Sequence, residues 1–249
     1  RQMCIRDSGY PVVSKEISKV IAEARKGIRQ GEGKYQNSIQ KLNGEFKDRD
    51  GKRSKYNCPK WKFLLDAPFE VSNKCCNIMK KNPAHLYERE TGRHAFIGTL
   101  ADESALRLNT WLYQGCNAFN NEHPVSNPLS FWTEDDILAY LIVNDLKYAD
   151  VYGNIIGKCE NLTFTASQVR KIVENAPQTW RERVSLSTTG LDRTGCVFCG
   201  FGAHLDPEPN RYQKLKEIEP KKYEYCFKSC SEGGLGFNDV MDYMGVNYK

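Results

Sequence analysis

The chain has 249 residues, of which 40% are hydrophobic and 27% are charged, and its formal net charge is +5. A chain of this length can bury a substantial core, as one large domain or two small ones. No apolar run is long enough to cross a bilayer, and the mild positive charge permits an anionic ligand without by itself indicating nucleic-acid binding. Ten cysteines without a secretory signal favour a reducing compartment, so we expect a cytoplasmic protein whose thiols bind metal rather than form disulfides.

Apolar spacing predicts several helices along the chain. From Ser14 to Ile28 apolar residues recur at helical intervals, and Ser72 is placed to cap a helix that carries two cysteines. Residues 45–62 are rich in lysine and arginine, which is typical of a solvated loop, with a nucleic-acid face as the alternative. Further helices are predicted after Thr133, after Ser167, and over residues 209–225 and 238–244.

One short segment is predicted to be a buried β-strand. Residues 95–98 are apolar and end in glycine, and the polar residues Asp102, Glu103, Ser104 and Arg107 follow them. Ligands collect outside the carboxyl ends of strands in open α/β sheets, so we expect this loop to bind a ligand. A structural ion pair between Glu103 and Arg107 is the alternative.

Two cysteine pairs dominate the sequence, the adjacent Cys75 and Cys76 and the C-x-x-C of Cys196 and Cys199. Thiolates are the ligands that iron–sulfur clusters and zinc select. One turn of a C-x-x-C presents two sulfurs to one metal, and adjacent cysteines supply two more if the backbone turns both to the same side. Because the pairs are far apart in sequence, only a folded domain could unite them. Four ordinary buried thiols are the alternative.

Other metal-binding residue types give weaker signals. Cys226 and Cys230 have a C-x3-C spacing that suits a redox pair, extra ligands or core thiols, and we favour core or partly exposed thiols. No mutual spacing that indicates a metal site is found among the histidines His85, His94, His123 and His204. His204 is closest to the C-x-x-C, and we expect it to contact the ligands of a metal site without binding the metal itself.

Five stretches taken together resemble the phosphoadenosine phosphosulfate reductase family, especially the variants carried by phages and mobile elements. The resemblance runs from about residue 9 to residue 248 and implies an adenine nucleotide α-hydrolase-like α/β fold: a parallel sheet flanked by helices, with a helical C-terminal region. We expect the remainder of the nucleotide-binding domain over residues 9–150 and a cysteine-containing region over 151–249. The matching stretches are residues 74–83, 98–107, 128–137, 189–199 and 234–240.

Two features of the family are missing from the sequence. The family's pyrophosphate loop, Ser-Gly-Gly-Lys-Asp-Ser, offers backbone N–H groups to phosphate, and no such motif is found here. We therefore expect an N-terminally truncated chain that is inactive alone. The assimilatory reductases also carry a catalytic cysteine near the C-terminus, where this chain ends without one, which argues against classical reduction.

The resemblance also implies site residues. Reductases that act on adenosine phosphosulfate have an adjacent Cys-Cys and a later C-x-x-C around a [4Fe–4S] cluster, and zinc is the alternative ion for the same thiols. The implied ligands are Cys75, Cys76, Cys196 and Cys199. The family's Glu-Ser-x-x-Arg segment and an arginine before the C-x-x-C imply a set that binds sulfate or phosphate through arginine forks. The implied substrate-binding residues are Glu103, Ser104, Arg107 and Arg193.

The function implied is that of a protein, an oxidoreductase or transferase, that handles an adenylated or sulfated nucleotide in sulfur metabolism with an iron–sulfur cluster. Its partner would be an adenine nucleotide or a phosphosulfate, with no membrane involved. One alternative is an ATP-dependent sulfurtransferase that modifies RNA or DNA, which the basic residues 45–62 would suit. The other is a non-catalytic, metal-stabilised accessory protein of a mobile element.

Overall fold

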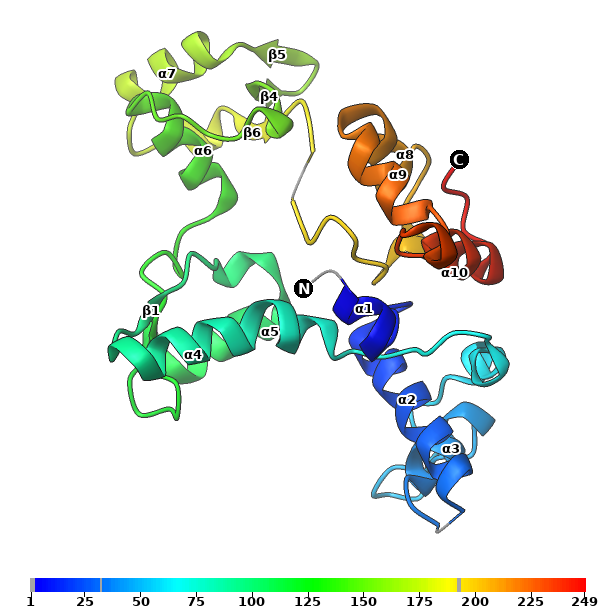
Figure 1. Ribbon diagram of the computed structural model, residues 1–249. Helices are drawn as coiled ribbons and strands as arrows, with labels where there is room; N and C mark the ends of the chain where they lie inside the picture. Colours follow the sequence, from blue (N-terminus) through cyan, green and yellow to red (C-terminus); the bar gives the residue numbers. More distant parts are fainter. Residues whose placement is uncertain (1–2, 32, 192–193) are drawn as a thin grey trace. The chain divides into compact units, whose positions relative to one another are not determined.

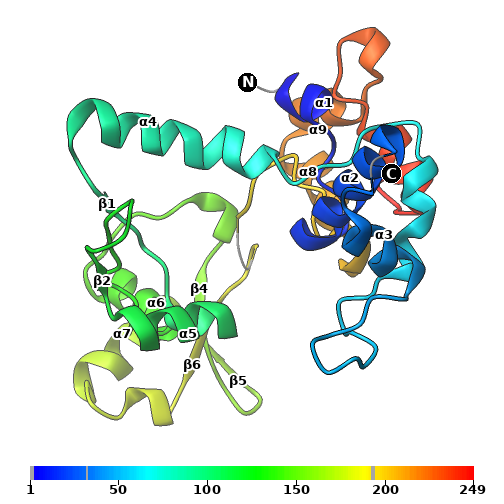
Figure 2. The same ribbon diagram turned by 90° about the horizontal axis from the view of Figure 1, so that it is seen from below.

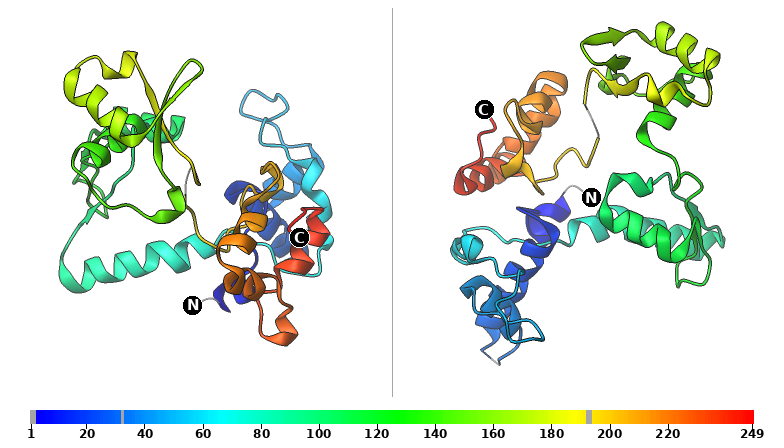
Figure 3. Two further views of the ribbon diagram at one scale, coloured as in Figure 1. Left: turned by 90° about the horizontal axis from the view of Figure 1, so that it is seen from above. Right: turned by 180° about the vertical axis from the view of Figure 1, so that it is seen from behind.

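We describe the protein from a computed structural model that defines residues 3–31, 33–191 and 194–249. The chain divides into two compact units, and each is described by itself. Unit 1 combines Arg1–Ala84 with Gly195–Lys249, and unit 2 comprises His85–Thr194. Figure 3 shows the blue and cyan first part of the chain together with its orange and red last part in unit 1. This division differs from the predicted domains 9–150 and 151–249, because the chain returns to unit 1 after residue 194.

Unit 1 is built mainly from helices around one apolar core, and the helical run that starts at Cys75 continues into unit 2 as α4 (Figure 1). The core includes the fully buried side chains of Ile21, Leu64, Tyr212, Phe237 and Val240. The helical elements are α1 (Met3–Ser8), α2 (Lys15–Gln30), α3 (Gln36–Asn43), η1 (Pro59–Asp66), η2 (Asn77–Lys81), α4 (Asn82–Thr91), η6 (Ala203–Leu205), α8 (Arg211–Ile218), α9 (Pro220–Phe227), η7 (Cys230–Glu232) and α10 (Phe237–Met244).

Helix α2 confirms the first predicted helix. The hydroxyl of Ser14 accepts a hydrogen bond from the N–H of Ile17 at 3.1 Å, which satisfies one of the unpaired donors of the first turn. Gly31 ends the helix with φ 67°, a left-handed conformation that glycine adopts without steric cost. The apolar face of α2 buries Val20, Ile21 and Ala24, as the helical spacing predicts.

A buried arginine on α2 closes the irregular chain around the end of η1. The side chain of Arg25 is 7% exposed and donates hydrogen bonds to the carbonyl oxygens of Leu64 at 2.8 Å, Ala67 at 2.7 Å and Phe69 at 2.6 Å. The Glu70 carboxylate lies 3.7 Å from the same guanidinium. Carbonyl groups at a helix end have no helical donor, so Arg25 satisfies groups that would otherwise be buried unpaired.

An extended segment of residues 10–13 lies between two parts of unit 1 that are distant in sequence. On one side, Tyr10 pairs in parallel with Val71, through hydrogen bonds of 2.7 and 3.0 Å to the residues flanking Val71. On the other side, Val13 pairs in parallel with Phe201, and its carbonyl accepts a 2.8 Å hydrogen bond from the residue after Phe201. Segment 10–13 therefore links the chain just before the first cysteine pair to the chain just after the second.

Unit 2 holds two small sheets. In the sheet of order β1-β3-β2, β1 runs parallel to β3 and β2 runs antiparallel to it; the sheet of order β5-β4-β6 is antiparallel throughout. Helices α6 and α7 cover the second sheet (Figure 2), and they share with it the buried residues Leu138, Ile142, Ile155, Val169 and Leu186. The elements are β1 (Ala95–Phe96), η3 (Ala101–Glu103), α5 (Ala105–Gln114), β2 (Asn117–Ala118), β3 (Val125–Ser126), α6 (Glu134–Val143), η4 (Asp150–Tyr152), β4 (Ile155–Cys159), β5 (Leu162–Phe164), α7 (Ala166–Asn175), η5 (Trp180–Glu182) and β6 (Ser185–Thr188).

The predicted parallel sheet flanked by helices is not confirmed. Among the named strands of the described chain, parallel pairing is limited to β1 with β3. The predicted buried strand over residues 95–98 shortens to β1, and the prediction that it is buried is wrong, because Phe96 is 82% exposed. Strand β1 is at the edge of its sheet, where one neighbour pairs with it and its side chains stay open to water.

The other predicted helices are found with some changes. Helix α6 follows its predicted cap Thr133, whereas α7 is preceded by Thr165 instead of Ser167. The single helix predicted over 209–225 is two helices, α8 and α9, because Pro220 has no N–H to continue α8. The last predicted helix is confirmed as α10. Among the helices that the structure describes, none has the length and apolarity required to span a bilayer.

Replacing Arg25 by methionine should lower the free energy of unfolding by about 3–5 kcal/mol, because three carbonyl groups lose a charged donor. The matched control is Arg29→Met. Arg29 pairs with the same Glu70, but its side chain is 64% exposed, so its loss should cost less than about 1 kcal/mol. Urea unfolding followed by circular dichroism measures both changes. Equal losses in the two variants would contradict the role assigned to Arg25.

Candidate functional site

Both cysteine pairs lie in unit 1. Cys75 and Cys76 are the first helical residues after a turn, and the run continues through the π-helical η2 into α4. Ser72, the predicted cap, instead closes that turn by accepting a 3.1 Å hydrogen bond from a backbone N–H two residues later. In the C-x-x-C, the N–H of Cys199 donates to the carbonyl of Cys196 at 3.0 Å, which forms a tight turn.

The ionisation of Cys75 and of Cys199 depends on burial and on neighbouring thiols. Burial, together with the neighbouring thiols of Cys76 and Cys199, raises the pKa of Cys75 to about 12. Burial also raises the pKa of Cys199, and the thiols of Cys196 and Cys76 add to this effect. Cys199 therefore lies near the first pair, and Cys196 adjoins Cys199 through the C-x-x-C turn; that the four bind one metal stays a prediction. A neutral thiol must lose its proton to bind metal, so binding here would release protons.

The four thiols differ in their access to solvent. Cys75 is buried, Cys76 and Cys199 are half-buried, and Cys196 is exposed. Cys196 is thus the most accessible of the four thiols and Cys75 the least.

Two residues that the sequence analysis missed hold the Cys199 loop. The guanidinium of Arg211 donates to the carbonyl oxygens of Cys199 at 3.2 Å and Phe201 at 2.9 Å, and it forms a two-pronged ion pair with Asp206. The hydroxyl of Tyr212, a fully buried residue, donates to the same Cys199 carbonyl at 3.1 Å. No motif marks these residues in the sequence, since their partners are backbone groups of another loop.

Gly200 brings the C-x-x-C loop against segment 10–13. A β-carbon at Gly200 would lie 2.2 Å from the carbonyl oxygen of Pro11, far inside the normal contact distance. Only glycine allows this approach without moving one of the two backbones. The position of the second cysteine pair therefore depends on the absence of a side chain at residue 200.

The C-x3-C cysteines have surroundings that suit core thiols. Cys226 is completely buried, and burial raises its pKa. The sulfur of Cys230 lies 3.6 Å from the hydroxyl of Tyr10. Those cysteines whose side chains the structure describes are all free thiols. This arrangement supports the core-thiol interpretation.

The predicted anion-binding residues of unit 2 lie at the start of α5. Ser104 caps the helix by accepting a hydrogen bond from the N–H of Arg107 at 3.3 Å. Glu103 forms an ion pair with Arg107 and accepts a 3.0 Å hydrogen bond from the N–H of Leu100. The ion pair between Glu103 and Arg107, the alternative to ligand binding, is therefore formed. Both charged side chains remain 43% exposed. Anion binding stays a prediction, and Arg193 lies outside the described residues.

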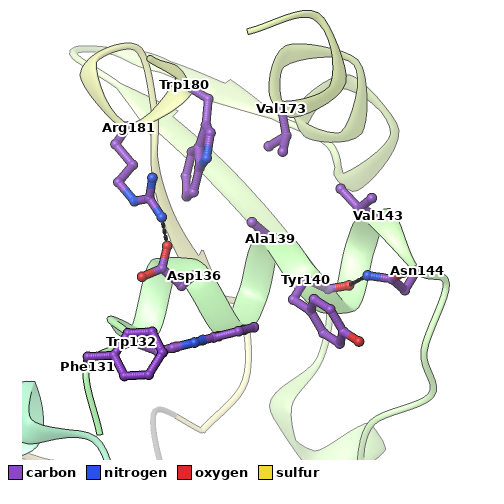
Figure 4. Close-up of a pocket in the computed structure, with 10 residues that line it drawn as sticks. All are labelled: Phe131, Trp132, Asp136, Ala139, Tyr140, Val143, Asn144, Val173, Trp180 and Arg181. Carbon is purple, nitrogen blue, oxygen red and sulfur yellow. Dashed lines mark hydrogen bonds and ion pairs between the residues drawn. The ribbon is translucent and has the colours of Figure 1, made fainter. Parts of the chain in front are cut away.

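A pocket of about 440 Å³ lies in unit 2 (Figure 4). Trp132, Tyr140 and Trp180 contribute aromatic walls, with the Trp132 ring edge-on to Tyr140 at 5.5 Å between centroids. Arg181 extends over the Trp180 ring and pairs with Asp136. Because Asp136 already balances this arginine, the pocket suits a flat ring better than a free anion. None of the predicted site residues that the structure describes lines it.

The histidines have different surroundings. His204 packs edge-on against Trp61, with 4.8 Å between ring centroids. By contrast, His85 and His123 contact each other and Glu88, although 38 positions separate them in sequence. The sequence spacing gives no sign of this contact, because it forms where a helix and a distant loop meet.

Comparison with protein-family models matches residues 10–200 to the phosphoadenosine phosphosulfate reductase domain. The matched range includes both cysteine pairs and the Glu-Ser-x-x-Arg segment. A search of curated proteins and a search of solved structures each found no match.

Gly200→Ala should lower the free energy of unfolding by about 1–3 kcal/mol, because the added methyl group collides with the Pro11 backbone. The displaced loop should also let Cys199 react faster with a thiol reagent. The matched control is Gly195→Ala, since a β-carbon at Gly195 meets nothing within 4 Å. Chemical unfolding and thiol-labelling rates measure both effects. If the two variants behave alike, this close approach does not position the loop.

Proposed function

The chain belongs to the phosphoadenosine phosphosulfate reductase family, and on this premise we propose that it handles an adenylated or sulfated nucleotide in sulfur metabolism with a [4Fe–4S] cluster. The family match itself supports a sulfonucleotide-related or other nucleotide-utilising function. The finer proposal is supported by one observation: both thiol pairs belong to unit 1, and Cys199 lies near enough to Cys75 to help raise its pKa.

The chemistry of the donor set suits a cluster. Tetrahedral zinc binds thiolates at about 2.3 Å, which places the sulfurs about 3.8 Å apart. Among the described residues, one group of three candidate ligands lies within 4.8 Å of one another, and it contains no cysteine. In a [4Fe–4S] cluster each thiolate binds a different iron, so more widely spaced sulfurs fit it better. Thiolate donors suit both a cluster and zinc, and the resemblance to adenosine phosphosulfate reductases favours the cluster.

Different residues would bind the cluster and the nucleotide. Cys75, Cys76, Cys196 and Cys199 would hold the cluster, which when bound supplies a one-electron redox centre. Arg211 would keep the C-x-x-C turn in place and set a positive charge beside the thiolates. Arg107 would bind the sulfate or phosphate of the nucleotide as a fork, and Glu103 would hold it in orientation. Arg193 would add a second cation to the same anion.

A sulfurtransferase acting on RNA or DNA is the second candidate. Its support is the basic stretch 45–62, in which Tyr56 is 61% exposed. The ammonium groups of Lys41 and Lys55 lie 5.9 and 5.5 Å from the centre of its ring. An exposed aromatic ring flanked by cations is a surface on which nucleic-acid bases stack. Sulfite release from a phosphosulfate would favour the first candidate, and ATP-dependent thiolation of RNA or DNA the second. The absence of both activities would favour an accessory protein.

Anaerobically purified protein should be brown and contain iron and acid-labile sulfide. Cys76→Ser and Cys199→Ser should lose both and unfold at lower temperature, because cluster binding contributes to folding. Cys116→Ser is the matched control, since Cys116 is half-buried in unit 2 and lies outside the four. Iron and sulfide analysis with the visible spectrum provides the measurement. A wild type that holds only zinc, or no metal after anaerobic reconstitution, would contradict the cluster.

Arg107→Ala should weaken binding of a phosphosulfate nucleotide about ten- to a hundredfold, which corresponds to about 1.5–3 kcal/mol for a lost charged hydrogen bond. Arg107→Lys should restore part of the affinity, because an ammonium cannot make the two-pronged contact. Iron content should stay unchanged in both. Calorimetric titration measures the affinity. An alanine variant that melts earlier but binds like the wild type would assign Arg107 to the ion pair with Glu103 alone.

A further inference from the structure

Three potential metal ligands converge in unit 2, in a group that contains none of the four thiols. The Nδ1 atom of His85 lies 2.5 Å from Nε2 of His123, and Nδ1 of His123 lies 3.0 Å from Oε2 of Glu88. The two imidazole rings are nearly perpendicular, at 85°, with centroids 3.5 Å apart. One ligand atom from each residue lies within 4.8 Å of the other two.

The local fold explains why these residues meet. His85 and Glu88 are three positions apart on α4, so their side chains share one face of the helix. The chain then enters β1, which pairs in parallel with β3, Ala95 opposite Val125. His123 lies in the loop between β2 and β3, two residues before Val125. The strand pairing therefore returns this loop to the helix that precedes β1.

We propose that His85, Glu88 and His123 form a binding site for a divalent transition metal of the zinc type. Imidazole nitrogen and carboxylate oxygen are ligands of zinc, and two histidines with one glutamate are a known three-residue zinc set that leaves a position for water. Ligands 2.0–2.1 Å from a tetrahedral zinc lie about 3.3 Å apart. The ring nitrogens, now 2.5 Å apart, need to separate by less than about 1 Å to admit the ion.

The surroundings of the three residues suit a bound cation. The side chain of Glu88 is 15% exposed and that of His123 is 43% exposed, so an ion would be partly shielded yet reachable from solvent. When His123 donates its Nδ1 proton to Glu88, its Nε2 lone pair faces His85. Carboxylates that hold histidine rings in this way orient them for metal binding. Glu88 also lies close enough to bind the ion directly, so its carboxylate supports the site in either arrangement.

The site would give α4 a connection that apolar packing does not supply. Helix α4 buries none of its side chains in the part of the chain that the structure describes. An ion bound between α4 and the β2–β3 loop would join the two elements directly. Without metal, the same residues make a hydrogen-bonded relay in which His85 donates to His123 and His123 donates to Glu88.

Cobalt titration of the full chain, purified anaerobically, tests the proposal. Cobalt bound to thiolates gives a sulfur-to-metal charge-transfer band that cobalt bound to imidazole and carboxylate lacks. The absorption spectrum therefore distinguishes cobalt at the cysteines from cobalt at the proposed site. We expect one equivalent to bind without that band, and zinc to displace it. His123→Ala and His85→Gln should lose this equivalent, and Glu88→Gln should weaken it about 10- to 100-fold. Added zinc should raise the melting temperature of the wild type more than that of these variants.

The matched control is His94→Ala, which removes an exposed histidine of the same unit and should bind cobalt like the wild type. Circular dichroism checks that each variant is folded, and His85→Gln keeps the proposal testable if the loop variant is not. Equal cobalt stoichiometry and affinity in the wild type, His123→Ala and His85→Gln would overturn the metal site. The three residues would then form only the hydrogen-bonded relay.

Discussion

Two backbone pairings on opposite sides of segment 10–13 position the chain next to both cysteine pairs of unit 1. The pairing of Tyr10 with Val71 positions the chain four residues before Cys75, and the pairing of Val13 with Phe201 positions the chain two residues after Cys199. A backbone hydrogen bond contributes only about 1 kcal/mol net. The pairings persist because apolar side chains at the same place, among them the fully buried Val12, leave water.

Irregular chain around this segment is stabilised by arginine. Arg25 serves three carbonyl groups around the end of η1, and Arg211 serves two in the loop after the C-x-x-C. Loops near a core carry carbonyl groups that no helix or sheet satisfies, and each unsatisfied group costs about 1–3 kcal/mol. A guanidinium has five donors in a fixed plane, so one side chain can satisfy several such groups. In unit 1, these two arginines therefore satisfy loop carbonyl groups that neither a helix nor a sheet pairs.

Features encoded within a few residues were predictable from the sequence. The apolar spacing of α2, the cap of α6 and the extent of α10 are local patterns, and all three helices are found. The four cysteines were singled out by their spacing, and both pairs belong to unit 1; that they bind one metal stays a prediction. Contacts between distant segments were not predictable in the same way. The exposure of Phe96, the support of Cys199 by Arg211 and the meeting of His85 with His123 each depend on which segments become neighbours, and no short pattern records that.

The order of synthesis has a consequence for unit 1, which is made from both flanks of an inserted unit 2. Cys75 and Cys76 leave the ribosome long before Cys196 and Cys199, on the order of ten seconds earlier at typical translation rates. During that interval helix α2 and its neighbours lack the partners that residues 195–249 supply, and the first thiol pair has no second pair beside it. Unit 2 draws its own core from one continuous stretch, so it can fold first and bring the two flanks of unit 1 together.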